Sequence, residues 1–520
     1  MSIAKPTGKI RWPAVLLAAV VVAIQPAPPA LAADGRVTVI VQMDAGASIP
    51  AGTAAVRRAG GRVTGRLAIV NGFAAEIPAR RIERLAAIPG VRAVTRNGRM
   101  EPKSIDATEL RSPYPGSVNA IDTWNAPDAG ATGKGVGVAV IDTGIAAQMP
   151  DFDVAGPERR TRVVASVVTN PYARTGYDTY GHGTHVAGIV GGNGTERAAR
   201  DKLRGHYVGI APEADLISVK VSDDRGRATV LDVIYGLQFV VDHADRYGIR
   251  VVNLSLESTA PQSYKTDPLD AAVEAAWFHG LVVVAAAGNR GNSEDAVSYA
   301  PGNDPFAISV GAIDDRASRR NVDDRRPSWS SHGVTQDGFA KPEIHAPGSR
   351  IVSTLAPFSM FTTMCRSCIV EREMIRAGGT SMSAPMVSGA AALLLEKHPQ
   401  LTPDEVKGVL MASARMVDEY PTVDVYAAVK AVDAGNVPVA NVGIEPNGLI
   451  DPQTGDIDYS RSSWSRSSWS RSSWSGAEGA PGAGWALSSW SCDCSRDANG
   501  EVLPSLSSWS LSSWSVDWSK

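Results

Sequence analysis

Residues 379–385 read Gly-Thr-Ser-Met-Ser-Ala-Pro and lead into an apolar run, Ala384 to Lys397, whose pattern predicts a helix. A serine at the start of a helix has its own backbone N–H and the positive end of the helix dipole beside its hydroxyl, and both favour negative charge there. Lone serines at such positions are usually helix caps. Other parts of this chain supply an aspartate and a histidine in comparable settings, so Ser381 is a candidate nucleophile.

The candidate aspartate, Asp142, follows the apolar run 136–141 and precedes Thr143-Gly144. Open α/β sheets place their sites at the carboxyl ends of strands, where this carboxylate would stand. An Asp-Thr-Gly tripeptide is also typical of aspartic proteases, but that class needs a second copy, which the sequence lacks. We expect Asp142 to hold the tautomer of an imidazole and to stabilise its charged form.

The candidate histidine, His182, stands between two glycines at the start of a predicted helix, 184–190. We expect His182 to act as a general base and then as a general acid. His182 and His185 also form a His-x-x-His pair, a spacing that metal sites use, but no further ligand cluster accompanies it. His185 is therefore expected to pack inside the helix.

The candidates occur in the order Asp, His, Ser, whereas α/β-hydrolases have Ser, Asp or Glu, His and usually Gly-x-Ser-x-Gly. A fourth candidate, Asn289, ends the segment Ala-Ala-Gly-Asn just after a predicted strand. Its side-chain amide would serve as a second donor to an oxyanion. The alternative is an ordinary Gly-Asn turn.

Together these segments resemble the subtilisin-like serine proteases, or subtilases. Four motifs match in order: 142–144, 182–188, 287–289 and 379–382. The resemblance implies a triad of Asp142, His182 and Ser381, an oxyanion hole completed by Asn289, and an extended peptide substrate bound as an added strand. The matching segments are 226–229 on one side of the peptide and 255–257 on the other, with Gly226, Ser255, Leu256 and Glu257 as the substrate-binding residues.

Three positions depart from the family pattern. Glu257 stands where the family usually has glycine, so its carboxylate would favour a basic residue on the acyl side of the cut; the alternative is a Glu that points to solvent. Met386 replaces a common histidine and is expected to pack in the core. Residues 200–207 lengthen the region where many relatives place a calcium loop, so structural calcium is not inferable. No metal or other cofactor is expected for the chemistry.

The region 111–435 alternates apolar strand patterns with helical ones, which predicts an α/β fold with a mostly parallel sheet flanked by helices. Its apolar runs lack alternation, as expected of strands buried on both faces. The predicted strands are 135–141, 216–221, 251–256, 281–286 and 306–310, and helices are predicted at 231–247, 268–279 and 384–397.

Residues 36–100 predict a small α+β unit of βαββαβ order, a ferredoxin-like arrangement. Strands 67–70 and 73–77 would be joined by Asn71-Gly72, a strong hairpin signal. The unit resembles the inhibitory pro-domain that precedes subtilases, and an ordinary ferredoxin-like domain is the alternative. The enzyme's own pro-domain is thus an expected partner, beside protein or peptide substrates.

The first 33 residues predict a signal peptide. A basic start is followed by the apolar run 14–24 and by Ala30-Leu31-Ala32, which fits a small-residue cleavage site. The run is shorter than the roughly 20 residues that cross a bilayer. The expected product is therefore secreted and extracellular, and association with the cell surface stays open.

The C-terminal region differs in composition. Residues 436–459 predict a spacer. Residues 460–520 contain repeated Ser-Ser-Trp-Ser units, and this region holds 8 of the 12 tryptophans. A disordered serine-rich tail and a module that stacks on sugars of a cell-wall polymer both fit.

The 520 residues carry a net charge of −3 and no long basic block, which argues against a nucleic-acid partner. The four cysteines, Cys365, Cys368, Cys492 and Cys494, allow three disulfide pairings, local or between the clusters. The sequence thus predicts a monomeric, secreted serine endopeptidase that processes its own precursor between Arg96 and Arg111. The alternative is a binding or adhesion protein in which a protease fold only presents the tryptophan tail.

Overall fold

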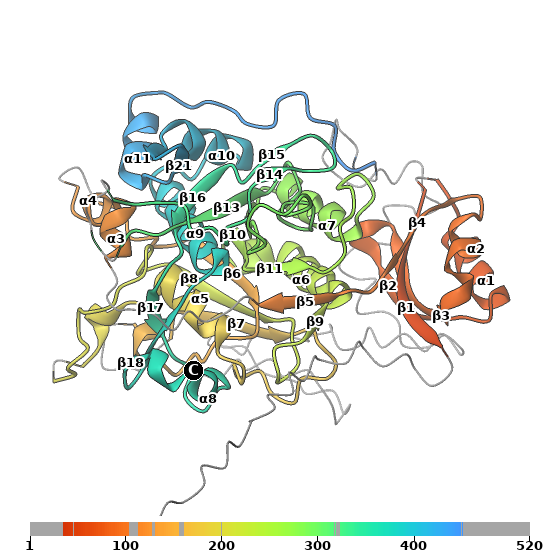
Figure 1. Ribbon diagram of the computed structural model, residues 1–520, viewed down its shortest axis with the longest axis horizontal. Helices are drawn as coiled ribbons and strands as arrows, with labels where there is room; N and C mark the ends of the chain where they lie inside the picture. Colours follow the sequence, from red (N-terminus) through yellow and green to blue (C-terminus); the bar gives the residue numbers. More distant parts are fainter. Residues whose placement is uncertain are drawn as a thin grey trace, which may run out of the picture.

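A large α/β body carries a small unit at one side (Figure 1). The computed structural model describes residues 35–44, 46–102, 113–126, 130–154, 161–198, 200–316, 318, 323–448 and 450. The predicted signal peptide, the Ser/Trp repeats, Cys492 and Cys494 lie outside the described residues. Within the described part of the chain, none of the helices has the length and apolar character that a membrane span needs.

A sheet of nine strands forms the centre of the body, in the order β20-β21-β16-β13-β12-β10-β6-β8-β7. Every neighbouring pair from β21 to β7 is parallel, and only β20 and β21 pair antiparallel. This confirms the predicted fold class. The strands are β6 (Gly137–Asp142), β7 (Val163–Val168), β8 (Asp215–Lys220), β10 (Ile249–Leu254), β12 (Val282–Ala286), β13 (Ile308–Ile313), β16 (Ile344–Pro347), β20 (Arg415–Val417) and β21 (Tyr420–Thr422).

Helices cover both faces of this sheet. The helices α5 (His182–Gly191) and α9 (Thr380–Lys397) pack together on one face, and α6 (Val230–Tyr247) and α7 (Pro268–Phe278) on the other. A capping box of Thr229 and Asp232 starts α6, and Gly248 ends it in the left-handed conformation. The body also contains α3 (Tyr114–Ser117), α4 (Ala120–Trp124), α10 (Pro403–Ala412) and α11 (Val425–Asp433), with 3-10 turns η3 (Pro150–Phe152) and η4 (Gly194–Glu196).

A smaller sheet, β17-β19-β18, precedes α9, and the first cysteine pair lies in the turns between β17 and β18. Cys365 and Cys368 form a local disulfide with a Cα–Cα distance of 5.3 Å. The elements here are β17 (Ile351–Thr354), α8 (Phe361–Met364), η5 (Arg366–Cys368), β18 (Ile369–Glu371) and β19 (Met374–Ala377), and a separate hairpin joins β14 (Gly333–Val334) to β15 (Ala340–Lys341).

The small unit is an antiparallel sheet in the order β2-β3-β1-β4. The predicted strand 67–70 is wrong: β2 ends at Leu67, which pairs with Gly72, so the hairpin loop has four residues. Asn71 ends this loop with φ of 45°, a left-handed conformation that asparagine tolerates. The elements are β1 (Arg36–Met43), α1 (Ile49–Arg58), β2 (Arg62–Leu67), η1 (Ala68–Val70), β3 (Gly72–Pro78), η2 (Ala79–Arg81), α2 (Ile82–Ala86) and β4 (Val91–Arg96).

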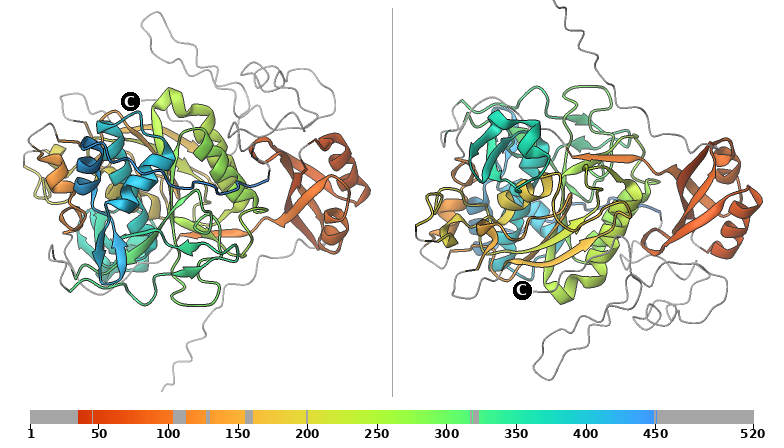
Figure 2. Two further views of the ribbon diagram at one scale, coloured as in Figure 1. Left: turned by 90° about the horizontal axis from the view of Figure 1, so that it is seen from above. Right: turned by 90° about the horizontal axis from the view of Figure 1, so that it is seen from below.

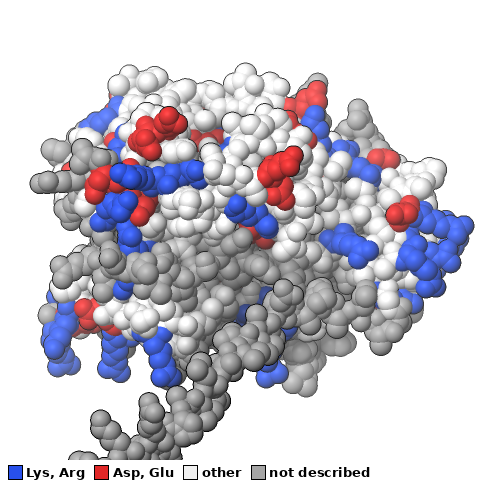
Figure 3. Space-filling model, viewed as in Figure 1, with Lys and Arg blue, Asp and Glu red and all other residues white. Residues whose placement is uncertain are grey.

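The two faces of the small sheet have different neighbours. Its outer face packs under α1 and α2, and its inner face lies against α6 and α7 (Figure 2). On the inner face, Ile40, Ile69 and Val70 are buried within the main core. Basic side chains gather on the outer surface of the unit (Figure 3). The helix α2 carries the exposed Arg84. The small unit is thus docked through an apolar face and leaves its basic face to solvent.

The segment after α11 was expected to be a spacer, but residues 436–448 pack on the body. We refer to these residues as the strap; it runs over α10 and past α7 toward the small unit (Figure 1). Ala440 N donates to Asp404 O at 3.0 Å. The Asn441 side chain also donates to Asp404, at 2.7 Å. Asn447 is fully buried. These polar contacts hold in place a stretch whose Pro, Gly and Asn content suggests a linker.

A buried guanidinium joins the turns on the β7 side of the body. Arg197 makes two hydrogen bonds to Asp151, at 2.7 and 2.8 Å, and pairs with Asp201 at 3.0 Å and with Glu373 at 2.8 Å. The Arg197 side chain is fully buried, and the Asp151 side chain is 1% exposed. The Arg197 cation thus compensates carboxylates from three separate segments.

Removing this cation would leave Asp151 as an uncompensated buried charge. We expect Arg197→Ala to lower the free energy of unfolding by about 3–5 kcal/mol, as broken buried pairs do. The measurement is thermal unfolding in a Ser381→Ala background, which limits self-digestion. The exposed Arg200 gives the matched control, Arg200→Ala. Equal melting temperatures for the two variants would contradict this account.

Candidate active site

Asp142 and His182 meet in the interior. Asp142 is the last residue of β6, and His182 is the first residue of α5. The His182 Nδ1 atom lies 2.7 Å from Asp142 Oδ1 and 2.9 Å from Oδ2. The backbone N–H of Thr143 donates to Oδ1 at 2.7 Å. Because both side chains are buried, the carboxylate fixes the imidazole so that Nε2 points away from it.

A second aspartate, which the sequence analysis missed, holds the start of α5. Asp178 is fully buried and accepts hydrogen bonds from Thr143 Oγ1, Gly181 N, Thr184 N and Thr184 Oγ1, all at 2.7–2.8 Å. Burial raises the pKa of Asp178, and the four donors oppose that shift. Gly181 enters α5 with φ of 108°, a conformation that favours glycine. No periodicity in the sequence marks Asp178.

Ser381 is the second residue of α9, as predicted, but its hydroxyl does not point to the imidazole. Ser381 Oγ donates to the carbonyl of Ser255 at 3.1 Å, and Ser255 Oγ donates back to the Ser381 carbonyl at 2.8 Å. His182 Nε2 is buried without a hydrogen-bond partner. The Ser381–His182 hydrogen bond of the expected triad is therefore not formed, because the Ser381 hydroxyl donates its hydrogen bond to the Ser255 carbonyl.

Asn289 lies beside the start of α9. Its Oδ1 accepts from Thr380 N at 2.9 Å and from Thr380 Oγ1 at 3.1 Å. Its Nδ2 is buried and has no hydrogen-bond partner. A Cβ on Gly379 would come within 3.2 Å of this Nδ2, so glycine keeps the space beside it open. Thr380 thus orients the Asn289 amide with a free donor near Ser381.

A strand from the N-terminal part of the chain lies along the predicted substrate-binding residues. β5 (Arg99–Pro102) pairs antiparallel with β11 (Leu256–Ser258) on one side and with β9 (Ala228–Thr229) on the other. These are the two edges between which the sequence analysis placed an extended peptide. The chain's own residues 99–102 therefore occupy the position of an added strand.

Glu257 on β11 points inward. It is 3% exposed, so the alternative of a solvent-facing side chain is wrong. Its Oε1 lies 3.2 Å from Arg290 Nη2, and a Cβ on Gly288 would lie 2.3 Å from Oε2. The Arg290 guanidinium in turn lies 3.7 Å from the centre of the Tyr299 ring. The carboxylate thus stands near the Asn289 segment with a cation of the same chain beside it.

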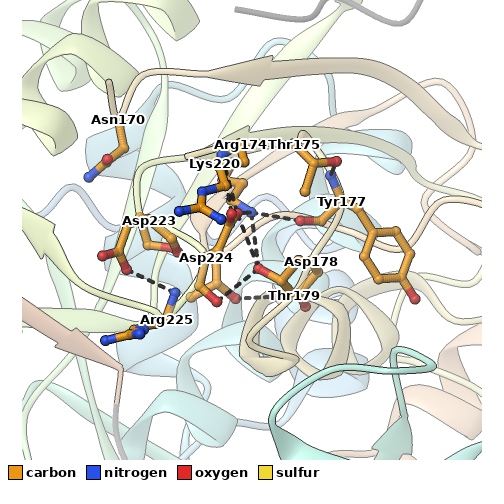
Figure 4. Close-up of polar contacts among 12 residues, drawn as sticks. Asn170, Arg174, Thr175, Tyr177, Asp178, Thr179, Lys220, Asp223, Asp224 and Arg225 are labelled. Carbon is orange, nitrogen blue, oxygen red and sulfur yellow. Dashed lines mark hydrogen bonds and ion pairs between the residues drawn. The ribbon is translucent and has the colours of Figure 1, made fainter. Parts of the chain in front are cut away.

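Gly226 lies just before β9, on the side of β5 away from Glu257. Its φ is 77°, and a Cβ added there would lie 2.6 Å from the Tyr180 ring. Nearby, Lys220 at the end of β8 donates to Tyr177 O at 2.6 Å and pairs with Asp224 at 3.3 Å (Figure 4). Burial lowers the pKa of Lys220, and the charges of Asp178 and Asp224 oppose that shift. A pocket opens here, lined by Asp142, Thr143, Val221, Ser222, Gly226, Ala228 and Leu256.

The remaining candidate for metal binding, His185, belongs to the core. Its Nε2 lies 3.2 Å from Ile351 O and 3.1 Å from Ile375 O. Burial lowers the pKa of His185 to about 3. Among the described residues, no group of three or more His, Cys, Asp or Glu side chains is arranged to hold a metal ion. His185 is thus a neutral donor that ties α5 to β17 and β19.

The depressed pKa of His185 predicts a pH-dependent stability. His185 takes up a proton near pH 6.5 in the unfolded chain and only near pH 3 in the folded chain. The contribution of neutral His185 to the free energy of unfolding is therefore complete above pH 6.5 and is lost as the pH falls toward 3. We expect His185→Gln to lose less stability than the parent between about pH 7 and pH 4.5. Urea unfolding at both pH values, with His206→Gln as the exposed control, measures this. Parallel losses in all three proteins would contradict it.

Comparisons with known proteins show which families the chain resembles. The family model described as "Subtilase family" matches residues 133–439, and one described as "Putative peptidase inhibitor domain" matches residues 20–97. Serine protease AprX of Bacillus subtilis (strain 168) is 39% identical over 307 residues, which are 58% of this chain and 66% of that protein. Subtilisin DY of Bacillus licheniformis is 36% identical over 287 residues, 55% of this chain and 85% of that protein.

The fold also resembles a solved structure. The crystal structure of fervidolysin from Fervidobacterium pennivorans, a keratinolytic enzyme related to subtilisin, aligns with a TM-score of 0.56. It is 22% identical, and the alignment covers 76% of this chain and 61% of fervidolysin. With the family model matching more than half of the chain, this chain belongs to the subtilase family of serine endopeptidases.

Proposed function

We propose that this chain is a secreted serine endopeptidase made as a precursor, in which the N-terminal unit inhibits the enzyme until it is cut away. The observation that supports this is the pairing of β5 between β9 and β11. A strand there blocks the edges on which a peptide substrate would pair. Two buried polar atoms of the site have no hydrogen-bond partner, His182 Nε2 and Asn289 Nδ2. In a reacting complex, the serine hydroxyl would bind to the first and the oxyanion to the second.

In the proposed reaction, Ser381 Oγ exchanges its hydrogen bond to Ser255 for one to His182 Nε2. Catalytic hydrogen bonds often form only in the substrate complex. His182 takes the hydroxyl proton as Oγ attacks the peptide carbonyl, and Asp142 stabilises the resulting imidazolium. The Ser381 N–H and the Asn289 Nδ2 donate to the oxyanion. His182 then protonates the leaving amine, and water releases the acyl group by the reverse sequence.

Processing of the precursor follows from the same arrangement. We propose a cut between Arg96 and Arg111, made by the chain's own site. Residues 103–111 of this stretch lie outside the described residues. Export with removal of residues 1–33, and binding of cell-wall sugars by residues 460–520, are proposals from the sequence. Wall binding that survives deletion of 460–520 would refute the latter.

The first test compares purified wild type with Ser381→Ala. We expect the wild type to yield a new N-terminus between residues 97 and 111 and to cleave casein, whereas Ser381→Ala stays a full precursor without activity. N-terminal sequencing and a casein assay give these results. A Ser381→Ala precursor that is processed as fast as the wild type, without added protease, would contradict self-processing.

The second test concerns the oxyanion donor. Asn289→Ala is expected to lower kcat by about 10²–10³ and to change KM little, because the lost hydrogen bond acts on the oxyanion and not on the bound peptide. Asn289→Asp is the matched variant, since it keeps the acceptor for Thr380 but removes the donor. Steady-state kinetics on a peptide substrate measure both. A variant that raises KM but keeps kcat would place Asn289 in peptide binding instead.

The third test concerns specificity. Glu257 is proposed to favour lysine or arginine on the acyl side of the cut, with Arg290 as an internal competitor for its carboxylate. Relative to a leucine substrate, Glu257→Gln is expected to lower kcat/KM for an arginine substrate about tenfold or more, whereas Arg290→Gln raises it. A peptide library profiles the three enzymes. A wild type with no preference for basic residues would remove this proposal.

A further inference from the structure

The strap ends directly against the small N-terminal unit. Arg92 on β4 donates from Nη2 to the carbonyl of Lys265 at 2.9 Å. A Cβ on Gly448 would lie 2.3 Å from Arg92 Nη2, 2.4 Å from Nη1 and 2.7 Å from Cζ, and these are the three nearest atoms. The guanidinium therefore meets Gly448 with the edge formed by its two terminal nitrogens, where any larger residue would displace it.

The same part of the strap supports the loop that receives Arg92. Tyr264 is 1% exposed and donates from its hydroxyl to the carbonyl of Glu445 at 2.8 Å. The Asn447 side chain donates to the Tyr264 carbonyl at 2.7 Å, and the Asn447 N–H donates to Glu274 Oε2 on α7 at 2.6 Å. The strap thus holds the residue next to Lys265, whose carbonyl accepts the hydrogen bond of Arg92.

Two acidic residues, Asp44 and Glu274, act on the Arg92 guanidinium. Burial lowers the pKa of Arg92, and the carboxylates of Asp44 and Glu274 oppose that shift. Asp44, in the small unit, makes the larger opposing contribution, and burial raises the pKa of Glu274 on α7, which weakens its share. A second polar contact lies nearby, where Thr95 Oγ1 lies 3.3 Å from the amide nitrogen of Gln262.

We propose that the strap forms part of the docking surface for the N-terminal unit and that Gly448, with the Lys265 carbonyl, forms a seat for the Arg92 side chain. The strap lies after α11, outside the helices and strands of the body, so inhibition depends on a segment that is not needed to build the catalytic residues. The inference rests on the proposed function, in which the small unit is an inhibitor.

Gly448→Ala tests the seat selectively. The added methyl group takes the space of the guanidinium, and the positions of the triad, Asn289 and the substrate edges are left untouched. Arg92→Ser removes the guanidinium instead and alters only the part of the chain that maturation discards. Arg84→Ala is the control, because Arg84 is an exposed arginine on the outer face of the same unit.

The experiment uses the full chain. Purified precursors are diluted into a small chromogenic peptide, and the time to half-maximal rate is recorded as the lag before the inhibitor is released. We expect Gly448→Ala and Arg92→Ser each to shorten this lag about tenfold, the effect of losing one charged hydrogen bond. The double variant should match Arg92→Ser alone, Arg84→Ala should match the wild type, and the final kcat/KM should be equal in all five.

Each other result contradicts a defined part of the account. A lag that Arg92→Ser shortens and Gly448→Ala leaves unchanged would show that the strap is not part of the seat. Additive effects in the double variant would show that the two residues act separately, which also overturns the proposal. A wild type that is fully active from the start would overturn the inhibitory function itself, and the strap proposal with it.

Discussion

The contact between the Asp142 carboxylate and the His182 imidazole is the interaction on which the site depends. It joins the end of β6 to the start of α5, and both partners are buried. A buried imidazole needs this carboxylate to hold its tautomer and to accept its charge. Asp178 serves this contact without touching it, because its four hydrogen bonds fix Thr143 and the first turn of α5. The Nε2 of His182 is buried and has no hydrogen-bond partner.

Much of this arrangement could be predicted from sequence because the signals are local. Continuous apolar runs identify buried parallel strands, and their carboxyl ends meet at one edge of the sheet. Asp142 and Asn289 follow such runs, and Ser381 opens an apolar helix, so their convergence was expected. The edges at 226–229 and 255–257 were also found in advance, through the resemblance to subtilases. All these positions lie at the end of a strand or at the start of a helix, and such places carry a recognisable sequence motif.

Other features depend on partners far away in the chain, and no local pattern records them. Arg290 beside Glu257, Asp404 beneath the strap and Arg92 on Gly448 are such cases. The strap was expected to be a spacer because Pro, Gly and Asn favour loops, but a loop can still be packed when its polar backbone finds partners. The hairpin at 68–71 was misplaced because Asn71-Gly72 suggests a two-residue turn, whereas the register pairs Leu67 with Gly72. The hydrogen bond of the Ser381 hydroxyl to the Ser255 carbonyl also depends on a distant partner, and no local pattern predicts it.

The central claim is that His182 activates Ser381, although the hydroxyl donates to Ser255 in the structure of the full chain. The most direct measurement is labelling of the processed enzyme with a fluorophosphonate that reacts with activated serines, followed by peptide mass spectrometry. The account predicts one adduct, on Ser381, formed at a rate that His182→Ala lowers by several orders of magnitude. An adduct on another serine, or equal labelling of Ser381 in His182→Ala, would contradict it.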